Sequence, residues 1–156
     1  MNALSKRIEQ GLRRVIGEGP IGLHDPLFTH QDYENLTHCL GTGVVSTAST
    51  AVESFEQLLC DAMGARHAVA VQSGTAALAL GLHLAGVRKG DEVLVPSFSF
   101  VATANAVSYL GAHPHFVDIS EQTLGVSPDG LRTHLSDVAE ITESGLMNRS
   151  TRRVIS

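Results

Sequence analysis

Apolar residues recur at helical spacing through the first third of the chain. In residues 1–16 the apolar residues fall on one helical face: Leu4, Ile8, Leu12 and Val15. Basic residues lie on the other face. Glycine and proline end this helix at 17–20, and further helices are predicted over 31–40 and 50–63. A basic amphipathic helix is also typical of membrane-surface or import segments. We expect it instead to pack on its own protein or on a second subunit.

From residue 67 short apolar runs alternate with helical stretches. Strands are predicted at 67–71, 92–95 and 115–119, helices at 75–85, 101–110 and 128–135, and a fourth strand beginning within 152–156. Ser127 and Pro128 form a cap and first-turn pair for the last helix. Repeated βα units of this length predict an α/β fold, with a mostly parallel sheet and helices on its faces.

A strand that starts at the end of the chain leaves a parallel sheet unfinished. We therefore expect residues 1–50 to form an N-terminal segment of helices and loops, and residues 51–156 to form an incomplete, truncated α/β domain.

Charge and cysteine content narrow the possible partners. The 156 residues carry a formal net charge of −5, with a pI near 5.8, which argues against nucleic acid as a partner. Cys39 and Cys60 have no metal-type spacing and are expected to be free thiols in a reducing compartment. No apolar run is long enough to span a bilayer, and no signal-peptide core is present. The sequence predicts a cytoplasmic protein that is not bound to a membrane.

Ser73-Gly74-Thr75 links the first predicted strand to a helix and is the strongest candidate binding site. Such a turn directs unpaired backbone N–H groups and the positive end of the helix dipole at one point, where a phosphate can bind. Gly74 allows close backbone approach, and Thr75 adds a hydroxyl. The alternative is a plain helix cap without a ligand. The patterns of P-loop and dinucleotide-binding turns are both absent.

Phe100 lies where the second predicted strand passes into a helix, with Phe98 two residues before it. A phenylalanine there can lie over a planar cofactor ring, although both rings could equally belong to the core. Ser97 and Asp118 also follow predicted strands, at the edge where open α/β sheets bind ligands. The eight histidines, with His113 and His115 among them, fit no zinc spacing and are assigned to surface or capping roles.

Four longer segments carry a family resemblance in order and spacing: Gly64–Leu80, Gly90–Val107, Gly111–Asp118 and Thr123–Pro128. Together they resemble the large domain of DegT/StrS-type nucleotide-sugar aminotransferases, over about residues 20 to 156. Upstream, residues 21–26 and 43–46 are most similar to the subgroup that acts on UDP-linked 4-keto amino sugars, as in legionaminic acid synthesis.

The resemblance implies a fold-type-I enzyme, usually a homodimer, with pyridoxal 5′-phosphate as cofactor. It implies transfer of an amino group from an amino acid, commonly glutamate, to a nucleotide-linked 4-keto sugar for cell-surface polysaccharide or nonulosonic acid synthesis. By position, Gly74 and Thr75 would hold the cofactor phosphate and Phe100 would stack on its ring. No catalytic or metal-binding role carries over to any residue of this chain.

Lysine is scarce in the chain, although pyridoxal phosphate enzymes use one as covalent anchor and base. Only Lys6 and Lys89 are present, in the first helix and in the turn before the second predicted strand. We therefore expect the chain alone to be inactive, as the N-terminal portion of an aminotransferase. The alternatives are a sugar dehydratase on the same scaffold, a non-catalytic fragment that binds a full-length subunit, and a generic nucleotide binder with affinity for NAD or ATP.

Overall fold

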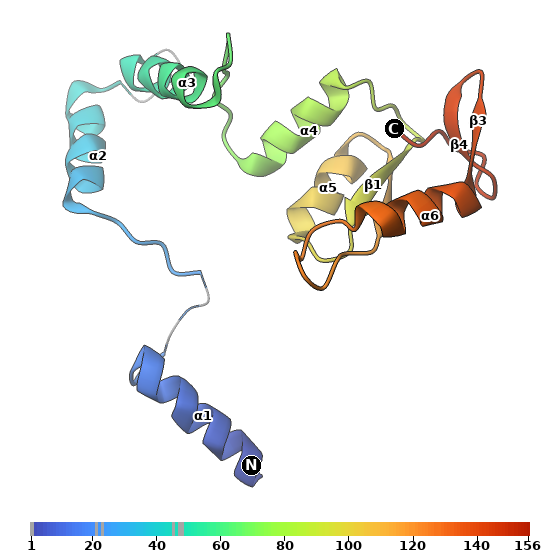
Figure 1. Ribbon diagram of the computed structural model, residues 1–156. Helices are drawn as coiled ribbons and strands as arrows, with labels where there is room; N and C mark the ends of the chain where they lie inside the picture. Colours follow the sequence, from blue (N-terminus) through green and yellow to red (C-terminus); the bar gives the residue numbers. More distant parts are fainter. Residues whose placement is uncertain (1, 21, 23, 45, 47–48) are drawn as a thin grey trace. The chain divides into compact units, whose positions relative to one another are not determined.

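The computed structural model describes residues 2–20, 22, 24–44, 46 and 49–156. The chain divides into two compact units, residues 1–66 and 67–156, and each is described by itself (Figure 1). The domain boundary predicted at residue 50 falls inside the first unit and stays a prediction. The similarities at residues 21–26 and 43–46 lie partly outside the described residues.

Three capped helices make up the regular structure of the first unit: α1 (Ala3–Ile16), α2 (His30–Thr42) and α3 (Thr50–Met63). A side-chain oxygen of Asn2 accepts the N–H of Ser5 at 2.8 Å, and that of Ser49 accepts the N–H of Val52 at 3.2 Å. These bonds satisfy N–H groups that have no partner inside a helix. The three helices predicted from the sequence are confirmed to within two residues at their ends.

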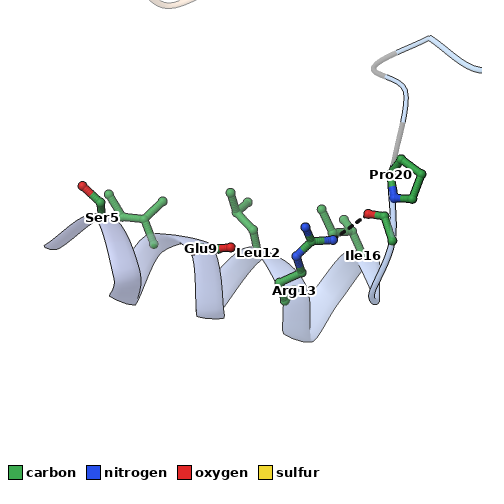
Figure 2. A pocket seen from close by; sticks show the side chains of 8 residues that line it. Ser5, Glu9, Leu12, Arg13, Ile16 and Pro20 are labelled. Carbon is green, nitrogen blue, oxygen red and sulfur yellow. Dashed lines mark hydrogen bonds between the residues drawn. The ribbon is translucent and has the colours of Figure 1, made fainter. Parts of the chain in front are cut away.

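The apolar face of α1 is exposed, and no residue of this helix is buried. Figure 2 shows Leu12 and Ile16 on one side of the helix, in a shallow hollow bounded by Pro20. Arg13 Nη1 donates to the carbonyl of Gly19 at 2.6 Å, which draws the chain back over the end of α1. Packing of this face on a protein partner stays a prediction. Among the described residues, no helix has the length and apolarity to cross a membrane.

The second unit is an α/β arrangement around one pair of parallel strands. In chain order it contains α4 (Gly74–Leu84), β1 (Glu92–Pro96), α5 (Val101–Tyr109), β2 (His113–Val117), α6 (Pro128–Val138), β3 (Ala139–Thr142) and β4 (Gly145–Asn148). Strands β1 and β2 run parallel, with Glu92 opposite His113 and Pro96 opposite Val117. Helix α5 connects the two strands, as the βα pattern predicts.

The predicted fourth strand is present at its beginning. The N–H of Glu92 donates to the carbonyl of Val154 at 2.7 Å, and the N–H of Ser156 donates to the carbonyl of Glu92 at 2.8 Å. Ile155 thereby pairs in parallel with Glu92, on the side of β1 away from β2. Strand β1 is therefore an inner strand at its amino end.

The core lies between β1 and the helices that pack on it. Its buried members are small or β-branched: Val87, Val93, Val95, Val107 and Ala112, with Leu82 and Leu110 packed against them. Helix α5 contacts α4, β1 and β2, and Val107 on its inner face is 1% exposed. Burial of this helix face fixes the start of α5 relative to the carboxyl ends of the two strands.

Two predictions about strands are corrected. Residues 67–71 form no strand, and Val69 is 73% exposed. An apolar run indicates burial but not a hydrogen-bonding neighbour, and a strand needs that neighbour. Strand β2 begins at His113, two residues before the predicted start. The N–H of His113 donates to the carbonyl of Asp91, so the nitrogen of Pro114 faces away from β1 and costs no hydrogen bond.

The hairpin formed by β3 and β4 was not predicted. Its strands pair antiparallel from Ala139–Asn148 to Thr142–Gly145, and Gly145 in the turn has φ of +110°. Helix α6 also runs to Val138, three residues beyond its predicted end. Its start is confirmed, because the Ser127 hydroxyl accepts the N–H of Gly130 at 3.2 Å with Pro128 in the first turn.

Candidate functional site

The start of α4 is built as the sequence predicts, although an extended segment rather than a strand leads into it. The Ser73 hydroxyl accepts the N–H of Ala76 at 3.2 Å, and the Ser73 carbonyl accepts the N–H of Ala77 at 3.0 Å. Gly74 and Thr75 are then the first helical residues, whose N–H groups have no partner within a helix. The first turn contains no acidic residue. This helix end can bind an anion.

Gly74 leaves open space at the start of α4. A Cβ atom built on this residue would have no neighbour within 4 Å. Gly74 is exposed and Thr75 is half-buried. The open space beside Gly74 leaves room for an anion at the start of the helix.

Phe100 lies just beyond the carboxyl end of β1, at the cap position of α5. The N–H of Ser97 donates to the carbonyl of Val117 at 2.9 Å and ties the exit of β1 to the end of β2. Ser99 and Thr103 then share a hydrogen bond between their hydroxyl groups at 2.9 Å. The Phe100 ring is 78% exposed and the Phe98 ring 66% exposed, so neither belongs to the core of this unit.

Asp118 follows β2 at the same carboxyl edge. Its carboxylate accepts the N–H of Ile119 at 2.8 Å and is exposed. The parallel register places the exits of β1 and β2 side by side, and the chain therefore brings Ser97 and Asp118 to one edge of the sheet. The packing of α4 against α5 adds a second helix to this part of the unit.

These groups suit a phosphorylated aromatic ring in two respects. Helix α4 offers backbone N–H groups with no carboxylate in its first turn, and Phe100 offers an exposed aromatic face. Lys89 does not join them, because it precedes β1 at the opposite end of the strand and its side chain packs on Gly111. Lys6 belongs to α1 in the other unit. Each group by itself suits one part of such a ring, and neither supplies a covalent anchor.

A buried polar cluster at the amino end of the strands was missed. Glu92 accepts a hydrogen bond from a ring nitrogen of His115 at 2.8 Å, and the other His115 nitrogen lies 2.7 Å from His134. The assignment of His115 to a surface or capping role was wrong, because the ring is half-buried against β1 and α6. The register of β1 on β2 was the signal needed, and sequence alone does not supply it.

Comparison with known proteins agrees with this architecture. The sequence pattern of the DegT/DnrJ/EryC1/StrS aminotransferase family matches residues 27–140. GDP-perosamine synthase of Vibrio cholerae is 31% identical over 116 residues, which cover 74% of this chain and 32% of that protein. The 3-oxo-glucose-6-phosphate:glutamate aminotransferase of Bacillus subtilis is 39% identical over 120 residues, covering 74% of this chain and 27% of that protein. The chain thus spans about a third or less of these relatives.

Solved structures show the same likeness. The sugar aminotransferase Spr1654 of Streptococcus pneumoniae, in its pyridoxal phosphate form, matches with a TM-score of 0.61 and 28% identity over 72% of this chain and 29% of its own. A GDP-4-keto-6-deoxy-D-mannose-3-dehydratase of Escherichia coli, with bound hydrated pyridoxal phosphate, matches with a TM-score of 0.61 and 26% identity. The match covers 71% of this chain and 30% of the dehydratase chain. The fold is therefore part of a pyridoxal phosphate aminotransferase fold, and the predicted cofactor is confirmed for the family.

Proposed function

Because the chain belongs to the DegT/DnrJ/EryC1/StrS aminotransferase family, we propose that it is the N-terminal portion of an enzyme that aminates a nucleotide-linked 4-keto sugar. The start of α4 carries this proposal, since it offers open backbone N–H groups without a carboxylate in its first turn. Glutamate is the proposed amino donor, and cell-surface polysaccharide or nonulosonic acid synthesis the proposed setting. A cytoplasmic homodimer remains the expectation from the sequence.

In this proposal the chain's own residues bind and orient the cofactor. The N–H groups of Gly74 and Thr75, with the Thr75 hydroxyl, hold the phosphate at the positive end of α4. Phe100 covers one face of the pyridine ring. When bound, pyridoxal phosphate supplies an electron sink for transfer of the amino group. The described carboxyl edge of this unit holds no lysine, and we propose that the chain alone binds the cofactor without turnover.

Direct titration tests the binding role. Pyridoxine 5′-phosphate is a suitable probe, because it lacks the aldehyde that would react with Lys6 or Lys89. We expect it to shift the amide NMR signals of Gly74 and Thr75, whereas pyridoxine without phosphate shifts them far less. Thr75→Val, which removes the hydroxyl at nearly constant volume, should weaken binding of the phosphate form. Equal shifts with both probes, or shifts centred on other residues, would contradict the proposed site.

Sugar dehydration is a second candidate reaction. The specific observation in its favour is the match to the Escherichia coli dehydratase at the same TM-score as the aminotransferase. Both reactions use the same cofactor cradle, so the experiment above does not separate them. The two reactions are separated by incubating the longest protein made from this gene with a 4-keto sugar nucleotide and identifying the reaction product by mass spectrometry. An amino sugar supports the first reaction, and loss of water without nitrogen gain supports the second.

A further inference from the structure

Three titratable side chains form a continuous chain of hydrogen bonds at the amino end of the parallel strands. Glu92 is the first residue of β1, His115 lies in the middle of β2, and His134 lies on α6. Glu92 Oε2 is 2.8 Å from His115 Nδ1, and His115 Nε2 is 2.7 Å from His134 Nε2. The Glu92 and His115 side chains are 6% and 12% exposed. The cluster therefore joins three elements largely away from water.

Glu92 also holds the segment after β4. Asn148 Nδ2 donates to Glu92 Oε2 at 2.9 Å, and Thr151 Oγ1 donates to Glu92 Oε1 at 2.5 Å. Burial raises the pKa of the Glu92 carboxyl, but the hydrogen bonds from Thr151, His115 and Asn148 outweigh it and hold the pKa below its usual value. The carboxylate is therefore ionised at neutral pH and acts only as an acceptor.

Proton counting limits the states of the two histidines. Since the carboxylate only accepts, His115 must donate from Nδ1. The Nε2 atoms of His115 and His134 then share one proton, given by either ring. If each ring carries two protons, both Nε2 atoms are donors. They then face each other at 2.7 Å without an acceptor between them. The contact between β2 and α6 thus persists with a neutral pair or a single cation, but not with two cations.

The other charged groups around the cluster come from each element that packs against it. Arg153 Nη1 lies 3.9 Å from Glu92 Oε1, and His113 on β2 lines the same hollow as Glu92 and His115. Asp118 and Asp137 line a hollow together with His134. Asp91 and Arg149 are the chain neighbours of Glu92 and Asn148. His113 is the only other imidazole of this set, and it is exposed. It provides a matched control.

We propose that Glu92, His115 and His134 form a proton-controlled latch that fastens α6 to the β1–β2 pair and releases it when both imidazoles are charged. The latch holds α6, and with it the β3–β4 hairpin, on the parallel strands. A metal-binding role is not supported, since no group of three or more His, Cys, Asp or Glu residues suits a metal in the described part of the chain.

The sign of the pH effect follows from the proton count. The closed latch binds at least one proton fewer than two separate, fully charged imidazoles do. Lower pH therefore favours the open form, and the opening constant rises by up to about tenfold per pH unit for each proton taken up on opening. Higher pH restores the closed form.

NMR of the full chain, with ¹⁵N label and EDTA present, tests the latch directly. At pH 7.5 we expect a scalar coupling between the Nε2 nuclei of His115 and His134 across their shared proton. The coupling should vanish as the pH is lowered. Amide exchange of α6, corrected for intrinsic rates, should accelerate at the same time, by up to about tenfold per pH unit for each proton taken up on opening. Absence of the coupling at pH 7.5 would overturn the proposal without any variant.

Two substitutions separate the latch from general acid sensitivity. His134→Gln keeps a side-chain N–H that can donate to His115 Nε2 but does not titrate, so exchange of α6 should become nearly independent of pH. His113→Gln removes the exposed neighbouring imidazole and should keep the full pH dependence. If His134→Gln retains the wild-type slope, the latch is wrong. Should that variant fail to fold, the coupling and its loss in the unaltered chain decide.

Discussion

The backbone N–H of Ser97 donates to the carbonyl of Val117 at 2.9 Å, so the exits of β1 and β2 are joined at the edge that carries Phe100. This bond extends the parallel register one residue past β1 and sets where α5 begins. The position of Phe100 and the start of α5 depends on the hydrophobic core, because Val107 anchors α5 to the strands. Stability of this core and geometry of the candidate site are therefore coupled.

Removal of buried volume from α5 should destabilise the second unit. Val107→Ala deletes two methyl groups at a residue that is 1% exposed, and we expect the free energy of unfolding to fall by about 2 kcal/mol. Val101→Ala, on the same helix at a residue 63% exposed, should change it by less than about 0.5 kcal/mol. Urea denaturation followed by circular dichroism compares the two. Equal losses of unfolding free energy in the two variants would mean that Val107 is not part of the core.

Loss of the Ser73 cap should weaken α4 locally. Ser73→Ala removes the acceptor for the Ala76 N–H, at a cost of about 1 kcal/mol. Amide hydrogen exchange should accelerate in the first turns of α4 and remain unchanged in α6. Ser99→Ala is the control, since the Ser99 hydroxyl bonds a side chain and caps no helix N–H. The cap would be unimportant if both variants exchanged alike.

Phe100 should matter for binding and not for stability. Its ring is 78% exposed, so Phe100→Ala should leave the melting temperature unchanged. Affinity for pyridoxine 5′-phosphate should fall by about 2- to 10-fold, the loss expected from one aromatic stacking contact. Phe98→Ala tests whether the neighbouring ring contributes. A lower melting temperature for Phe100→Ala would instead indicate a core role.

Acid should weaken the fold through Glu92. The folded pKa of Glu92 is lowered, so its stabilising contribution is present above the ordinary glutamate value of about 4.3 and is lost as pH falls through the folded value. Glu92→Gln should therefore be less stable at pH 7, and its free energy of unfolding should fall less steeply below pH 4. Urea titrations at pH 7, 5, 4 and 3 measure this difference. The prediction would be refuted if the free energy of unfolding fell equally with pH in the wild type and in Glu92→Gln. The same would hold if the exposed control Glu121→Gln behaved like Glu92→Gln.

Local signals in the sequence predicted the helices of this chain well. Ser73 and Ser127 cap helices through bonds between near neighbours, and Gly43 and Gly64 end helices with positive φ. Strands need partners distant in sequence, and there the prediction was weaker. The run at 67–71 has apolar residues but forms no ladder, while the 139–148 hairpin depends on a turn at Gly145 that carried no clear pattern.

The residues of the candidate site were likewise predicted where local sequence determines their position, and missed where strand pairing determines it. The positions of Gly74, Thr75 and Phe100 at helix starts followed from local pattern and from family resemblance. The link of Glu92 to His115 could not be predicted, because it depends on which residues face each other across two strands. A shift of two residues in the start of β2 was enough to hide it.

The pairing of Ile155 with Glu92 gives the end of the described chain a direction. Residues joined to Ser156 in that direction would advance about 3.3 Å per residue beside β1. A peptide of three residues fused there would reach the level of Pro96, next to the exit that leads to Phe100. Ser156 is thus an attachment point from which a short fused reporter, such as a fluorophore-bearing peptide, could sense a ligand at that edge.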